Sequence, residues 1–158
     1  STGNVEMHME ACDAAVMISQ VVGEYQDKLQ AQDIEIVVNE AKNPANIMAD
    51  GRHLWRVFDN IMGNICKYTQ DHTRVYVNVE DAGDQVRMIF KNISKYPLNI
   101  SSDELMERFV RGDASRNTEG HGLGLSIASS LTALMDGQLT IDIDGDLFKI
   151  TVAMKKQA

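Results

Sequence analysis

Cysteine, proline and aromatic residues are all scarce in this chain of 158 residues. The two cysteines, Cys12 and Cys66, stand far apart and form no CxxC pair. They therefore indicate two reduced thiols in a cytosolic protein or, more simply, two small core residues. Only two prolines are present, and no repeat or low-complexity tract accompanies them, so no stretch has the composition of a linker. We expect a single domain over residues 1–158 that folds without a disulfide or metal staple.

Long apolar runs and an excess of basic charge are also missing. No run approaches the roughly 18 apolar residues of a membrane span, and the first residues carry no basic-then-apolar signal pattern. Fifteen Lys and Arg residues stand against 23 Asp and Glu residues, giving a net charge of −8 that repels duplex nucleic acid and anionic membranes. We therefore expect no nucleic-acid partner and no direct membrane contact. Any phosphate ligand must be bound by local features.

Apolar spacing predicts helices and strands in mixed order. Three main helices are expected at 14–29, 51–68 and 123–135, with Asp50 capping the second and Gly137 ending the third. A capping-box pattern at 101–104 predicts a short helix that ends at Phe109. Strands are expected at 34–38, 46–49, 75–80, 86–90, 139–143 and 147–152, with a weakly alternating edge strand at 5–10 that includes His8. Because several strands form hairpins, the fold class is α+β: a two-layer sandwich of a mixed, mostly antiparallel sheet and three main helices.

The second predicted helix has two distinct faces. On a helical wheel a core-facing stripe is formed by Leu54, Phe58, Ile61, Met62 and Ile65. A neighbouring arc holds Asn60, Asn64 and Lys67, with Tyr68 between the two. This arc is either an ordinary solvated face or a ligand site. Asparagine is a poor helix former, whereas its amide oxygen suits Mg²⁺, an ammonium suits phosphate and an aromatic ring offers a stacking surface, so the arc sketches a metal–nucleotide site.

A glycine-rich run at 120–125 opens the third helix. Glycines there allow close backbone approach and leave N–H groups free for phosphate. The run is weak by itself, because a tight helix entry needs the same residues and the preceding strand of a Rossmann or Walker loop is absent. The polar stretch 111–119 before it is either a surface loop or a lid whose arginines, Arg111 and Arg116, fork onto phosphate oxygens.

These segments together resemble the ATP-binding catalytic domain of bacterial sensor histidine kinases, in the ATPase superfamily shared with gyrase, MutL and the ninety-kilodalton heat-shock chaperones. The resemblance covers residues 5–154 and includes an N box at 60–69, a phenylalanine box at 105–113 and the second glycine box at 120–125. It implies a Bergerat-type fold that binds Mg·ATP.

Site roles follow from that resemblance residue by residue. Asn64 would ligate Mg²⁺, Asn60 would support the metal or nucleotide, Lys67 would meet a phosphate and Tyr68 would lie against adenine. Arg111 or Arg116 would reach the phosphates from the lid. The remaining nucleotide contacts would come from Asn92, Phe109, Gly120, Gly122, Leu123 and Gly124.

Asn60 separates kinase from hydrolase within this superfamily. The hydrolases carry a glutamate at its position as the general base for water, whereas an amide is essentially non-basic. The preceding Asp59 lies about 100° away on the wheel. The sequence therefore predicts phosphoryl presentation with little ATP hydrolysis, and an ATP-hydrolysing clamp is the least favoured alternative.

The first glycine box departs from the family pattern. After the strand at 86–90 the chain runs through 91–97 without either glycine, and Asn92 takes the place of the aspartate that accepts a hydrogen bond from the adenine amine. Its amide oxygen can accept the same bond without charge, which predicts weaker affinity and adenine selectivity.

The resemblance also implies partners. The γ-phosphoryl group would pass to a histidine on separate dimerisation helices, which this chain lacks, and then to an aspartate of a response-regulator receiver domain. We expect a monomeric fragment that does not phosphorylate itself, from the cytosolic part of a membrane-anchored sensor. The alternative, motivated by the altered glycine box, is a degenerate nucleotide-sensing or protein-docking module.

Overall fold

The computed structural model describes residues 6–43, 45–98, 104 and 122–157. The helices in this part are α1 (Ala14–Gln30), α2 (Gly51–Tyr68) and α4 (Gly122–Leu134). The strands are β1 (Glu10–Asp13), β2 (Glu35–Asn39), β3 (Asn46–Ala49), β4 (Arg74–Asp81), β5 (Gln85–Ile93), β6 (Gln138–Asp144) and β7 (Leu147–Lys155).

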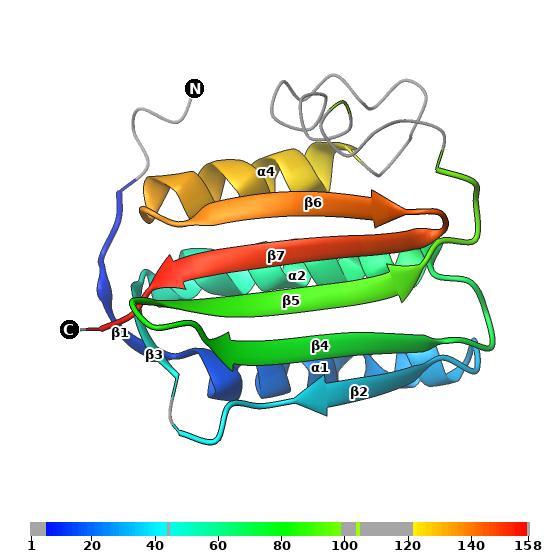
Figure 1. Cartoon of the computed structure of the whole chain (residues 1–158), viewed down its shortest axis with the longest axis horizontal. Coiled ribbons are helices and arrows are strands. Elements are labelled where there is room, and N and C mark those ends of the chain that lie inside the picture. Colours follow the sequence, from blue (N-terminus) through cyan, green and yellow to red (C-terminus); the bar gives the residue numbers. More distant parts are fainter. Residues whose placement is uncertain (1–5, 44, 99–103, 105–121, 158) are drawn as a thin grey trace.

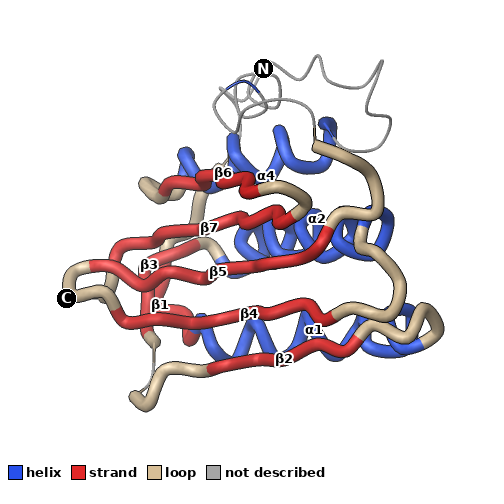
Figure 2. The backbone as a smooth tube through the Cα atoms, turned by 45° about the vertical axis from the view of Figure 1, so that its right-hand side comes forward, coloured by secondary structure: helices blue, strands red, loops and turns tan. Residues whose placement is uncertain are grey.

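Five strands form the main sheet in the order β2-β4-β5-β7-β6 (Figure 1). β2 runs parallel to β4, and the other neighbouring pairs are antiparallel. The helices form one layer on a single face of this sheet, as the turned view in Figure 2 also shows. β1 and β3 make a separate two-stranded antiparallel sheet. The predicted α+β two-layer sandwich is therefore confirmed.

The three predicted main helices are confirmed to within one residue at each end, because their apolar spacing is strong and capped. The predicted strand at 86–90 is too short, since β5 continues through Asn92 to Ile93 while it pairs with β7. The predicted edge strand containing His8 is wrong. The strand starts at Glu10, and His8 lies before it. The short helix expected at 101–109 falls outside the described residues except for Glu104.

The core lies between the sheet and the helix layer. Phe58 of α2 and Phe90 of β5 are both buried and pack with their ring centroids 5.9 Å apart. All five members of the apolar stripe predicted on α2 are buried. This packing fixes how α2 is rotated about its axis, and with it the direction of the helix's polar side chains.

Asp50 anchors the start of α2. Its carboxylate accepts hydrogen bonds from the backbone N–H groups of Arg52 and His53, as an N-cap does, and from that of His8 at 2.8 Å. Burial alone would raise the pKa of Asp50, but these N–H donors outweigh it and hold the pKa below its usual range. The capped helix end is thereby tied to the segment that leads into β1.

Gly137 allows β6 to start close against β7. A Cβ atom at this position would lie 2.4 Å from Met154 Sδ and 2.7 Å from the carbonyl oxygen of Ala153. Any larger residue would push these elements apart. The glycine predicted to follow the third helix is thus required for packing against β7, and α4 itself finishes at Leu134.

Candidate functional site

α2 lies between α1 and α4 and packs against both (Figure 1). Two asparagines one helical turn apart, Asn60 and Asn64, sit on the flank of its apolar stripe. Asn64 is only 7% exposed. The Nδ2 atom of Asn60 and the Oδ1 atom of Asn64 are buried without a hydrogen-bond partner. Such orphaned groups cost about 1–3 kcal/mol each unless a ligand or water supplies the partner, which makes this face of α2 a candidate binding site.

Neighbouring residues of α2 point to different helices. A Cβ atom on Gly124 of α4 would lie 3.9 Å from Asn60 Cβ, so Asn60 faces the start of α4. Asp59 instead faces α1, where the Tyr25 hydroxyl donates a hydrogen bond to its Oδ1 atom. The separation predicted for Asp59 and Asn60 on the wheel is confirmed. Asp59 is thus engaged with α1.

The end of α2 is joined to the end of β5. The backbone N–H of Gln70 donates to the Ile93 carbonyl at 2.8 Å, and that of Lys95 donates to the Tyr68 carbonyl at 2.9 Å. Between them the buried Asn92 amide donates from Nδ2 to Thr69 Oγ1 at 3.0 Å. Asn92 therefore lies on the helix-facing side of the sheet, beside the helix that carries Asn60 and Asn64.

The other predicted members of the N box differ in exposure. Lys67 is exposed, whereas Tyr68 is half-buried and engaged with other residues. An exposed ammonium suits a phosphate contact, and a half-buried aromatic ring suits a base contact. The exposure of each side chain agrees with the contact predicted for it.

The structure describes the glycine run from Gly122 onward, whereas the predicted lid at 111–119 lies outside the described residues. Gly122 begins α4 and Leu123 follows it in the helix, so the predicted helix start is confirmed for the run. The predicted site residues Phe109, Arg111, Arg116 and Gly120 lie outside the described residues. The part of the site that the structure places together is thus the α2 face, the first turn of α4 and the end of β5.

Amide oxygens are the available metal ligands. In the described part of the chain, no group of three or more His, Cys, Asp or Glu side chains is placed to hold a metal ion. The buried Oδ1 of Asn64 is a hard, unpartnered donor of the kind that suits Mg²⁺, which binds through few protein ligands and completes its shell with water and substrate phosphates. The residues present therefore fit a Mg²⁺ ion that arrives with a nucleotide.

Two titratable groups on the α1 side of α2 stay in their neutral forms. Burial, followed by the hydrogen bond to Asp59, raises the pKa of the Tyr25 hydroxyl well above its usual range. Burial also raises the pKa of the Cys66 thiol, against a smaller lowering by Lys28. Both cysteines are free thiols, and neither is activated as a nucleophile.

Two hydrogen bonds near the site were not predictable from the sequence. The Thr69 hydroxyl joins Asn92 to α2, and Tyr25 holds Asp59. The first pairs residues 23 positions apart and the second residues 34 apart. A local sequence pattern does not predict hydrogen bonds between residues this far apart in the chain. The only sequence signal was the position of Thr69 directly after the predicted helix.

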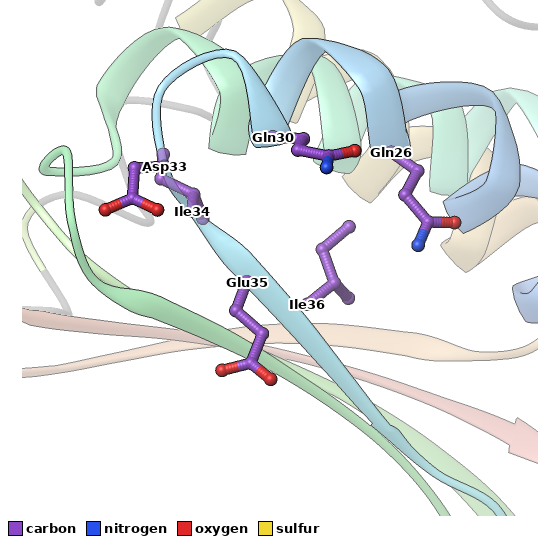
Figure 3. A pocket seen from close by; sticks show the side chains of 6 residues that line it. All are labelled: Gln26, Gln30, Asp33, Ile34, Glu35 and Ile36. Atoms are coloured by element: carbon purple, nitrogen blue, oxygen red, sulfur yellow. The ribbon is translucent and has the colours of Figure 1, made fainter.

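A pocket of about 370 Å³ lies elsewhere, between α1 and β2 (Figure 3). It is lined by Gln26, Gln30, Asp33, Ile34, Glu35 and Ile36. None of the predicted site residues lines it. β2 and β6 are opposite edges of the sheet, so this pocket is separated from α4 and plays no part in the candidate site.

Comparison with known proteins finds one family and several related sensor proteins. Residues 49–157 match the family described as histidine kinase-, DNA gyrase B-, and HSP90-like ATPase. The probable sensor protein PcoS of Escherichia coli is 34% identical over 112 residues, which cover 68% of this chain and 24% of PcoS. The sensor protein VanS of Enterococcus faecium is 30% identical over 129 residues, covering 80% of this chain and 33% of VanS. The chain thus spans a quarter to a third of these relatives.

Solved structures agree on the fold. The catalytic domain of histidine kinase ThkA in a nucleotide-free form superposes with a TM-score of 0.83 at 20% identity, covering 95% of this chain and 97% of that domain. The mycobacterial sensor histidine kinase MprB gives a TM-score of 0.76 at 20% identity, with 95% and 99% covered. In the described part of the chain, no helix is long and apolar enough to cross a membrane.

Proposed function

Because the chain belongs to the histidine kinase-, DNA gyrase B- and HSP90-like ATPase family, we propose that it binds Mg·ATP and donates the γ-phosphoryl group to a histidine. The acceptor histidine would lie on dimerisation helices outside this chain, and a response-regulator aspartate would then receive the group. The family and the fold make the chain an ATP-binding catalytic domain of the sensor histidine kinase type. The metal, the transfer step and the partners are the proposal.

One observation carries the proposal: two buried amide atoms without partners lie one helical turn apart on α2, and one of them belongs to Asn60, which lies beside Gly124 at the start of α4. Folding alone gives no reason to keep them. A nucleotide held against the first turn of α4 would give the Asn60 amide an acceptor, and its metal would give the Asn64 carbonyl oxygen a cation. Both costs would be relieved by one ligand.

The remaining roles follow the same geometry. Lys67 at the exposed rim would neutralise phosphate charge, and Tyr68 and Asn92 would hold the base at the end of β5. Backbone N–H groups at Gly122 and Gly124 would meet phosphate oxygens. Phe109, Arg111, Arg116, Gly120 and Leu123 complete the expected site as sequence predictions.

The proposed step is a displacement at phosphorus. A ring nitrogen of the acceptor histidine forms the new N–P bond while the bond from the γ-phosphorus to the β,γ-bridging oxygen breaks, and ADP leaves. Such a transfer asks for positioning and charge neutralisation more than for covalent chemistry by the protein. Asn60 offers no base for water, and Asp59 is occupied by Tyr25. Transfer to the histidine would therefore outrun hydrolysis.

Residues 1–158 would form one catalytic domain that is monomeric without the dimerisation helices and works in the cytosol. The relatives PcoS and VanS are a probable sensor protein and a sensor protein. A response-regulator receiver domain would be the downstream partner.

Reconstitution tests the transfer. The chain is mixed with a separately prepared phosphoacceptor helical domain and Mg·ATP, and the product is assayed for acid-labile, base-stable phosphate. The expected result is phosphohistidine with the native chain and much less with Asn64→Ala. Absence of phosphohistidine, or equal amounts with both chains, would contradict the transfer function.

A second candidate function rests on one specific feature. Residues 91–97 hold neither glycine of the first glycine box, and Asn92 replaces an acidic acceptor. A chain that binds ADP and ATP but never yields phosphohistidine with any acceptor domain would be a nucleotide-sensing or docking module. The same reconstitution therefore separates the two functions.

A further inference from the structure

Asn92 presents a chemical ambiguity that an aspartate would not. A carboxylate offers acceptors only, whereas a carboxamide has an acceptor oxygen on one side and an NH₂ donor on the other. Rotated by 180°, the same side chain would receive a base with a carbonyl at position 6 instead of one with an amine. The base preference of this site therefore depends on what fixes the rotation of the Asn92 amide.

The hydrogen bonds around Thr69 fix that rotation. The Thr69 side chain is fully buried, and its Oγ1 lies 2.6 Å from the carbonyl oxygen of Ile65. A carbonyl oxygen only accepts, so the single hydroxyl proton of Thr69 is donated there. What remains on Oγ1 is a lone pair, and the Asn92 atom 3.0 Å away must be the donor, Nδ2.

The donor and acceptor roles in these hydrogen bonds hold for either orientation of the Asn92 amide that one might assume at the outset. If the amide were turned, Oδ1 would face a hydroxyl that has no proton left to give, and a buried acceptor would lose its partner. In the structure no described residue donates a hydrogen bond to Asn92 Oδ1. That oxygen is left to accept a hydrogen bond from a ligand.

We propose that Thr69 is a positioning residue that locks the Asn92 carboxamide with its oxygen toward the base, so that the site selects a 6-aminopurine over a 6-oxopurine. The inference rests on the proposed nucleotide site and extends it. A 6-amino group donates to the locked oxygen. A 6-oxo group would meet an acceptor with an acceptor, which leaves both unpaired.

Calorimetric titration with Mg·ADP and Mg·IDP tests the lock, because hypoxanthine has a carbonyl at position 6 and a proton on N1 where adenine has a 6-amine and a bare N1. Neither nucleotide is a phosphoryl donor here. The native chain should prefer ADP. Thr69→Val removes the hydroxyl at nearly constant volume, frees the amide to turn, and should lower the ADP-to-IDP preference by about fivefold, the worth of one neutral hydrogen bond. Thr69→Ser keeps the hydroxyl and should keep the preference.

A matched control is available on α4. Thr132 is also fully buried, and its hydroxyl likewise donates to the carbonyl four residues earlier, that of Ala128, at 2.7 Å. Among the described residues, no side-chain amide donates to this hydroxyl. Thr132→Val should leave the ADP-to-IDP ratio unchanged. In an Asn92→Asp background, where both oxygens accept, Thr69→Val should lose its effect on the ratio.

Failure of the lock and failure of the nucleotide site give different results. An unchanged ratio in Thr69→Val, with intact binding, would overturn the lock. If the native chain binds neither nucleotide, the proposed function fails, and the lock is then judged in the ligand-free protein by NMR. Cross-peaks between the Asn92 carboxamide protons and the Thr69 side chain are expected in the native chain. Their absence would overturn the lock.

Discussion

Replacing Asn64 with leucine should stabilise the ligand-free chain and abolish its metal-dependent nucleotide binding. Most substitutions of buried residues have the opposite effect on stability. The opposite result is expected here because Asn64 is buried, with only 7% of its surface exposed, and its Oδ1 atom has no hydrogen-bond partner. Leucine has the same number of side-chain heavy atoms, although it is bulkier, and carries no group that needs a partner.

The magnitude follows from two opposing contributions. Removing a buried, unsatisfied acceptor returns about 1–3 kcal/mol to the free energy of unfolding. Leucine is the larger side chain, and the overpacking that it causes costs about 1 kcal/mol at the low end of the usual range. The net gain is about 1 kcal/mol, which corresponds to a rise in Tm of about 2–4 °C for a domain of this size.

Thermal unfolding of the ligand-free chain, followed by circular dichroism, measures the shift. Thr132→Val is the matched control, since Thr132 is buried but its hydroxyl is hydrogen bonded, and this variant should lose about 0.5–1.5 kcal/mol. The reasoning is refuted if Asn64→Leu lowers the Tm as the control does, or if it still binds Mg·ADP with native affinity. Either result would make Asn64 an ordinary structural residue.

Three further predictions concern the supports of the site. Tyr25→Phe removes the donor to the Asp59 carboxylate and should lower the free energy of unfolding by about 1.5–3 kcal/mol at pH 7, measured by urea denaturation. Because the pKa of Tyr25 is raised in the folded state, this stabilisation is fully present below the ordinary tyrosine pKa of about 10 and is lost at higher pH. A difference in unfolding free energy between the native chain and Tyr25→Phe that stays constant up to about pH 11 would argue against the hydrogen bond. Gly124→Ala should leave the fold intact, since its Cβ would meet only an ordinary contact at 3.9 Å, yet weaken Mg·ADP binding at least tenfold; unchanged binding by calorimetry would place the phosphates elsewhere. Gly137→Ala should cost about 1–3 kcal/mol through overpacking, whereas Gly23→Ala, with open space around its Cβ in mid-helix, should gain about 0.5–1 kcal/mol, and equal Tm values for the two would contradict the steric account.

The α2 helix shows how far the sequence alone could go. Its stripe and its polar flank were predictable because both repeat at the helical period, and the structure confirms that Asp59 and Asn60 face different neighbours. Its start was predictable from Asp50, a residue with a capping side chain.

Contacts between distant elements were not predictable in the same way. β5 extends beyond its apolar alternation because β7 pairs with it up to Ile93, and the strand near His8 begins later because its partner is β3. The pairing of Thr69 with Asn92 likewise depends on where the sheet places β5. Such features are set by tertiary packing, which overrides local preference.

The central claim is that the face of α2 bearing Asn60 and Asn64 forms a metal–nucleotide site with the start of α4. The most direct measurement is calorimetric titration of the chain with a non-hydrolysable ATP analogue, with Mg²⁺ and with the metal chelated, on the native protein and on Asn64→Ala. We predict saturable binding that is weakened at least tenfold by either change. Equal affinity with the metal chelated and in Asn64→Ala would contradict this site. So would the absence of binding by the native chain at millimolar nucleotide.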